Sequence, residues 1–237
     1  MHALAAQPPM PVHVLFEDNH LLAVSKPAGL PTMGARQGEL SLIIAAKDYI
    51  RRTCNKLGNV YLGVVSRLDA PVTGIVLFAR TSKAAARLNR MFQEGQIRKL
   101  YWAIVERVPK PPAGECLDWL RKNQSQRQME ICDAGAAGSR QARLAYRLLQ
   151  RLPRGALIEV ELFTGRKHQI RVQLAHRGWP VAGDTKYGGR LRFAPGIALH
   201  ARALEFVHPV KNTPIRLLCP VPESWRTFGL PEGLGEG

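Results

Sequence analysis

The stretch VVSRLDAPVTGIVLF, residues 64–78, decides the fold of this chain. It places Asp69 between two apolar runs of β type, and Pro71 and Gly74 break the chain between them. The chain has 18 acidic residues against 34 Lys and Arg, so a carboxylate at an apolar junction is costly unless it is paired or used. Taken alone, Asp69 is more typical of a hairpin turn, and its meaning depends on the segments around it.

Outward from this stretch, the hydrophobic pattern predicts many strands and few helices. Helices are expected over 40–52, from an N-cap at Ser82 to about Glu94, and from the end of the motif at 164–171 to Gly178. Because no regular βαβ rhythm appears, we expect an α+β fold on a mixed, mainly antiparallel sheet with flanking helices. The expected strands lie at 12–16, 21–25, 99–106, 116–120, 128–132, 143–149, 157–163, 203–208 and 215–219.

The composition and net charge of the chain indicate which kinds of partner it can bind. The 237 residues are 46% hydrophobic, enough for one large or two small domains. The charge balance, 34 − 18 = +16, favours a polyanionic partner, and nucleic acid leads among these. No basic amphipathic helix with aromatic anchors and no apolar run of spanning length stands out, so no membrane partner is expected.

The cysteine and histidine spacings predict neither a disulfide framework nor a metal site. The four cysteines form no CxxC pair and read as reduced thiols of a cytoplasmic protein. His168 with His176, and His200 with His208, are eight residues apart, a coincidence that is usually structural. The first residues, MHALAAQPPMP, are too proline-rich for a signal peptide.

Six segments, taken in order, resemble the RluA-type family of RNA pseudouridine synthases. The resemblance covers about residues 13 to 220, nearly the whole chain. It implies the pseudouridine synthase fold with a central RNA-binding cleft. The matching segments are EDNHLLAVSKPAGL (17–30), SRLDAPVTGIVLFART (66–81), KLYWAIV (99–105), TGRKHQIR (164–171), VAGDTKYGG (181–189) and LHA with LEFVHP (199–209).

The resemblance implies a role for each matching position. Asp69 falls on the family's catalytic aspartate, Tyr101 on the tyrosine that contacts the target base, and Arg171 on the basic residue that pairs with the aspartate. Arg67 matches an arginine that helps to prise the base from the RNA stack. Ser66 departs from the histidine that the family usually has there. No cofactor is expected, because the isomerisation moves the ribose C1′ bond from N1 to C5 of uracil without oxidation or net hydrolysis.

Further basic residues in the matching segments are expected to contact RNA. Lys26 and Lys186 are loop bases suited to phosphate. Arg166, Lys167 and His168 precede the expected short helix, where anions bind readily, although a solvated face explains such charges equally well. Without the resemblance, Tyr101 would be assigned to the core or the sheet surface.

The chain is expected to contain an N-terminal extension at 1–11, a catalytic domain at 12–222 and a partly disordered tail at 223–237, with no room for an S4 RNA-binding module. We expect a cytoplasmic monomer that modifies rRNA or tRNA. Two alternatives stay open: a non-catalytic RNA-binding or chaperone protein, and a hydrolase that releases the base. Whether Asp69 attacks the sugar or the base also stays open.

Overall fold

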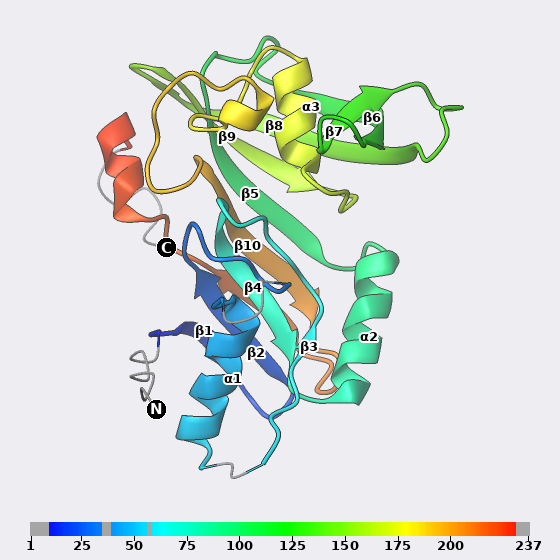
Figure 1. Ribbon diagram of the computed structural model, residues 1–237, viewed down its shortest axis with the longest axis vertical. Coiled ribbons are helices and arrows are strands. Elements are labelled where there is room, and N and C mark those ends of the chain that lie inside the picture. The colour runs from blue at the N-terminus through cyan, green and yellow to red at the C-terminus, as the bar shows by residue number, and fades with distance from the viewer. Residues whose placement is uncertain (1–9, 35–38, 56–57, 231–237) are drawn as a thin grey trace, which may run out of the picture.

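The computed structural model describes residues 10–34, 39–55 and 58–230, and it arranges eleven strands in one mixed sheet (Figure 1). The strands are β1 His13–Glu17, β2 Leu21–Lys26, β3 Gly63–Val64, β4 Thr73–Ala79, β5 Arg98–Val105, β6 Ala113–Asn123, β7 Gln128–Cys132, β8 Arg140–Leu152, β9 Gly155–Leu162, β10 Leu199–Val207 and β11 Pro214–Leu218. Their order is β1-β2-β4-β10-β5-β9-β8-β6-β7, with β3 beside β4 and β11 beside β10. Every pair is antiparallel except β4 with β10, which confirms the predicted α+β class.

Three α-helices accompany the sheet in the described residues: α1 Leu42–Thr53, α2 Ser82–Gln93 and α3 Gln169–His176. The predicted N-cap of α2 is wrong by one residue. The cap is Thr81, whose backbone is extended and whose hydroxyl accepts a hydrogen bond from the Ala84 N–H at 3.1 Å.

The chain after β11 continues into the folded part of the molecule. Residues Glu223–Phe228 form a 3₁₀ helix, and the Trp225 side chain is fully buried, with its ring edge-on to the ring of Phe193. The expected tail is therefore ordered at least to Leu230, which is also buried. Residues 231–237, and residues 1–9 of the expected N-terminal extension, lie outside the described residues.

Strand β4 is buried on both faces, which explains its continuous apolar run. Ile75 and Leu77 pack in one cluster with Leu88 of α2. Val76 and Phe78 pack in another cluster with α1, whose residues Leu42, Ala46 and Ile50 are buried there. Since successive strand residues point to opposite faces, α1 and α2 cover opposite sides of this part of the sheet. Each large apolar side chain buried in this way contributes about 1.5–3 kcal/mol.

The parallel contact between β4 and β10 requires a glycine. Gly74 pairs with Ala201 and has a φ of +111°, and a Cβ at this position would lie 2.4 Å from the Ala201 carbonyl oxygen. Beside it, the Thr73 hydroxyl lies 2.8 Å from Nδ1 of His200, and Nε2 of His200 lies 3.1 Å from the Cys219 carbonyl oxygen. The start of β4, directly after the Asp69 loop, is thus tied to a buried histidine.

His200 should make the protein less stable in acid. Burial lowers the pKa of His200 to about 4, against an ordinary value of 6.5, so the unfolded chain binds more protons between these pH values. Stability therefore falls as the pH falls from 6.5 towards 4, by about 3 kcal/mol from this residue. In urea titrations at several pH values, His200→Gln should show a smaller loss of unfolding free energy over that interval than wild type. Parallel pH profiles for the two proteins would contradict this.

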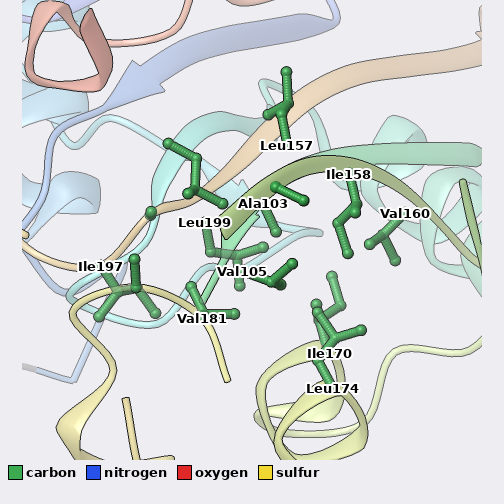
Figure 2. Packing of buried hydrophobic residues seen from close by; sticks show 14 of the residues in the cluster. Ala103, Val105, Leu157, Ile158, Val160, Ile170, Leu174, Val181, Ile197 and Leu199 are labelled. Atoms are coloured by element: carbon green, nitrogen blue, oxygen red, sulfur yellow. The ribbon is translucent and has the colours of Figure 1, made fainter. Parts of the chain in front are cut away.

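Helix α3 is fixed against the sheet by its apolar face. Figure 2 shows Ile170 and Leu174 directed towards Ile158 and Val160 of β9. All four side chains belong to the largest buried cluster of the described residues. The docking fixes the rotation of the helix about its axis, and with it the direction of Arg171, the residue that follows Ile170.

Candidate active site

An open pocket of about 820 Å³ lies where the loop after β3, strand β5 and the N-terminal end of α3 meet. The volume is within the range of ligand-binding pockets, about 300–1,000 Å³. The three predicted catalytic residues, Asp69, Tyr101 and Arg171, all line it although they are distant in sequence. The charged and phenolic residues of its wall include Arg67, Asp69, Lys99, Tyr101, Arg166 and Arg171.

The Lys26 side chain fixes the loop that carries Asp69 through hydrogen bonds to backbone carbonyls. The Lys26 ammonium is buried, with the residue 1% exposed, and donates hydrogen bonds to the backbone carbonyls of Pro27, Leu30 and Ala70 at 2.7, 2.8 and 3.0 Å. This contradicts the prediction that Lys26 contacts RNA. Because its donors are occupied inside the protein, Lys26 positions the loop instead.

The predicted strand before Asp69 is much shorter than expected. β3 ends at Val64, and the Ser66 hydroxyl then accepts a hydrogen bond from the Leu77 N–H of β4 at 2.8 Å. On the other side, the Thr32 hydroxyl donates to the Leu68 carbonyl at 3.0 Å. Side chains thus replace the strand ladder along this segment. Ser66, the departure from the family pattern, anchors the loop to β4.

Arg171 bridges two carboxylates. Its Nη1 donates to Oδ2 of Asp69 at 2.9 Å, while Nε and Nη2 donate to the two oxygens of Asp184 at 2.7 and 2.8 Å. The Arg171 and Asp184 side chains are 6% and 1% exposed, and that of Asp69 is 27% exposed. Burial lowers the pKa of Arg171, but the hydrogen bonds and charges of both carboxylates outweigh it, so its net pKa is raised. The pair with Asp184 therefore fixes a permanent cation beside Asp69.

Asp69 keeps one oxygen available. Among the described residues, each hydrogen bond or ion pair of its side chain involves Oδ2, from Arg171 at 2.9 Å and from Nε2 of His168 at 3.6 Å. Its Oδ1 accepts no hydrogen bond from the side chains and backbone within 10–34, 39–55 and 58–230. A carboxylate held through one oxygen and free at the other suits covalent or proton-transfer chemistry.

Asp184 was not recognised in the sequence as part of the site. Asp184 lies in the segment VAGDTKYGG and occupies the N-cap position of the 3₁₀ helix Thr185–Tyr187, but its side chain accepts no capping hydrogen bond and pairs with Arg171 instead. The scarcity of acidic residues was the signal that could have identified it.

His168 lies beside Asp69 rather than on the outer surface. It precedes α3 in the left-handed region, with φ of 53°, which is uncommon for a residue with a side chain. Its Nδ1 is 2.8 Å from the Tyr187 hydroxyl. Burial lowers the pKa of His168 to about 4, although the Asp69 charge opposes this, so the imidazole is neutral near pH 7. The Tyr187 ring also lies under the Arg171 guanidinium, 5.1 Å from ring centre to Cζ.

Tyr101 lies on β5 and lines the pocket together with Asp69. Burial, with a smaller contribution from the Asp69 charge, raises the pKa of Tyr101 to about 12. The hydroxyl is therefore protonated at neutral pH and available as a hydrogen-bond donor. The aromatic strand that sequence alone assigns to the core or sheet surface thus presents one ring to the pocket.

The remaining predicted RNA contacts divide into two groups. Arg67 and Lys167 are exposed and line the pocket. Arg166 also lines it, with its Nε donating to the Gln141 carbonyl at 2.9 Å. The structure does not bring Lys186 to the pocket wall, and its ammonium donates to the Arg127 carbonyl at 2.9 Å.

In the part of the chain that the structure describes, no three His, Cys, Asp or Glu side chains are grouped so that they would hold a metal ion. None of the helices described there has the length and apolar character needed to span a bilayer.

Comparison with known proteins identifies the family. The family model for RNA pseudouridylate synthase matches residues 20–176. Ribosomal large subunit pseudouridine synthase D of Xanthomonas campestris is 36% identical over 238 residues, covering 92% of this chain and 69% of that protein. The protein of the same name from Xylella fastidiosa is 34% identical, covering 90% and 67%. An uncharacterized RNA pseudouridine synthase of Zymomonas mobilis is 34% identical, covering 91% and 96%.

A solved structure shares the fold. The human RNA pseudouridylate synthase domain containing 4 superposes with a TM-score of 0.74 at 26% identity, covering 89% of each chain. The resemblance to RluA-type enzymes is thereby confirmed. With its pocket, its paired aspartate and these relatives, the chain belongs to the RNA pseudouridylate synthase family and is an isomerase that converts uridine to pseudouridine in RNA.

Proposed function

We propose that this protein modifies ribosomal RNA and that Asp69 is its catalytic carboxylate, acting on a uridine turned out of the RNA stack. The observation that carries the proposal is the arrangement of Asp69: buried Arg171 holds Oδ2, and Oδ1 accepts no hydrogen bond from the residues that the structure describes. The choice of ribosomal RNA follows the relatives named ribosomal large subunit pseudouridine synthase D, which are up to 36% identical to this chain.

The reaction balances within the substrate. The bond from ribose C1′ to N1 of uracil breaks, the base rotates, and a new bond forms from C1′ to C5. The proton lost from C5 is balanced by the one gained at N1. Attack of Asp69 on the sugar, attack on the base, and removal of a ribose proton all need a carboxylate oxygen that faces the substrate, which Oδ1 supplies. Arg171 fixes the carboxylate and compensates its charge.

The pocket suits an everted nucleotide. Turning a base out of its stack costs about a few kcal/mol, which contacts inside the pocket must offset. The Tyr101 ring offers a stacking surface for the uracil, while exposed Arg67 and Lys167 bring positive charge to the same pocket for the RNA backbone. With a net charge of +16, binding should weaken steeply as salt rises.

Incubation with RNA labelled in its uracil rings tests the proposal against both alternatives. The proposed enzyme forms labelled pseudouridine and releases no base. A hydrolase would release free uracil, and a non-catalytic RNA-binding protein would retain the RNA unchanged. Repeating the reaction with separated rRNA and tRNA then tests the substrate class, and modification confined to tRNA would contradict the choice of rRNA.

Tyr101→Phe should keep the ring and remove the hydroxyl. RNA affinity should stay close to wild type because stacking is preserved. The single-turnover rate should fall by about 10²-fold, as expected when a positioned proton donor or acceptor is lost. Tyr61→Phe, an exposed tyrosine outside the pocket, is the matched control. An unchanged single-turnover rate in Tyr101→Phe would show that the hydroxyl has no part in the reaction.

A further inference from the structure

Lys99 is a largely buried residue whose ammonium opens onto the pocket and has no partner among the described residues. The residue is 8% exposed, yet no hydrogen bond or ion pair joins its ammonium to any residue that the structure describes. Burial lowers the pKa of its amine, and no neighbouring charge opposes this. The donors of this ammonium are not used by the fold, so they are available to a ligand that enters the pocket.

The contrast with Lys26 shows what a structural lysine looks like in this protein. Lys26 is also buried, but its ammonium is surrounded by three backbone carbonyls within 3.0 Å. Lys99 has no such carbonyls, and its side chain lines the active-site pocket. Its amine is therefore available to a ligand that enters the pocket and is not used by the fold.

Lys99 and Tyr101 belong to one surface. Both lie on β5, two positions apart, so their side chains project from the same face of the strand, about 7 Å apart along it. Their partners on β10 are Leu204 and Ala201, which bring no charge to the pair. A ligand that rests on the Tyr101 ring can therefore reach the Lys99 amine as well.

We propose that Lys99 binds a phosphate group of the RNA that flanks the nucleotide held against Tyr101. The inference rests on the proposed function, since it takes the ligand of the pocket to be RNA. A lysine ammonium acts as a compact point charge and is a common phosphate partner. A phosphate would supply both the negative charge and the acceptor oxygens that the protein leaves out at this position.

The test compares Lys99→Met with wild type in RNA binding over a series of salt concentrations. Each neutralised phosphate adds about 0.7 to 0.9 to the slope of log affinity against log salt. Lys99→Met should lower that slope by roughly this amount and weaken binding about tenfold at low salt. Lys99→Arg, which keeps the charge, should retain most of the slope. Lys83→Met is the control, because Lys83 is exposed in the first turn of α2, away from the pocket wall.

A second measurement separates a ligand-binding lysine from a structural one. Because the Lys99 ammonium makes no hydrogen bond or ion pair with the described residues and is partly desolvated, Lys99→Met should leave the melting temperature at or above that of wild type while it weakens RNA binding. A lower melting temperature would show that Lys99 supports the fold and would overturn the proposal. Weaker binding with an unchanged salt slope would show that Lys99 contacts an uncharged group of the RNA, such as a base carbonyl. Normal affinity with lost turnover would assign it to the chemistry, and both results overturn phosphate binding.

The two proposals fail separately. If wild type forms no pseudouridine in labelled RNA, the proposed function is wrong, while the salt slope still decides whether Lys99 meets a phosphate. If wild type forms pseudouridine and the slope of Lys99→Met matches that of wild type, only the phosphate contact is wrong.

Discussion

Asp69→Asn should abolish pseudouridine formation and leave RNA affinity within about tenfold of wild type. The amide has nearly the shape of the carboxylate and can still accept a hydrogen bond from Arg171, so the pocket should persist. An amide cannot act as the nucleophile or take up a proton at neutral pH, so the rate should fall by at least about 10³-fold. The measurements are single-turnover modification with enzyme in excess and RNA affinity by titration.

Asp133→Asn is the matched control for this change. Asp133 is exposed in the turn between β7 and β8 and does not line the pocket, so its amide variant should modify RNA at the wild-type rate. Retained turnover in Asp69→Asn would remove Asp69 from the chemistry. Loss of RNA binding and of activity together would instead assign Asp69 to the binding surface.

Asp184→Asn should be the most destabilising single charge removal at the site. It leaves Arg171 buried with only the more exposed Asp69 as an anionic partner, and breaking one partner of a buried ion pair costs about 3–5 kcal/mol. For a chain of this size each kcal/mol lowers the melting temperature by about 2–4 °C, so a fall of roughly 10 °C is expected. Turnover should also fall, by about 10²-fold, because Arg171 no longer holds the Asp69 carboxylate in one orientation.

The control for Asp184 is Asp48→Asn. Asp48 pairs with Arg51 on the exposed surface of α1, and such pairs contribute less than about 1 kcal/mol. Calorimetry of both variants gives the comparison directly. Equal melting temperatures for the two variants would show that the buried pair adds nothing to stability. A wild-type turnover rate in Asp184→Asn would show that Arg171 does not need this second anchor.

The sequence predicts the elements of this fold well because their physical signals are local. The two-sided burial of β4 appears as the continuous apolar run Ile75–Phe78. The predicted short helix is present as α3, which begins within the motif at 164–171 and ends at His176, two residues before the expected stop at Gly178. The motifs also select Asp69, Tyr101 and Arg171, which the fold brings into one pocket from three separate segments.

The misjudged residues have environments made by distant segments. Lys26 reads as a loop base because it precedes a proline, and the carbonyl of Ala70, 44 residues away, helps to bury it. Asp184 reads as a turn residue because nothing near it in sequence shows that Arg171 comes within 2.7 Å. Lys99 reads as one polar residue in a strand. That its ammonium has no hydrogen-bond or ion-pair partner among the described residues becomes clear only when its spatial neighbours are known. The spacing of residue types along the sequence reports local conformation. Whether a charged side chain finds a partner depends on segments that the completed sheet brings together.

The place of β10 in the sheet also affects how the molecule is made. This strand comes from the last quarter of the chain but lies between β4 and β5, pairing His200 with Thr73 and Ala201 with Tyr101. During synthesis, the edges of β4 and β5 that pair with β10 keep unpaired backbone groups until β10 has been made. Contacts between segments so far apart in sequence also slow folding. The strand that follows the Asp69 loop and the strand that carries Tyr101 are therefore joined only near the end of translation, and a truncated product would lack the strand that unites them.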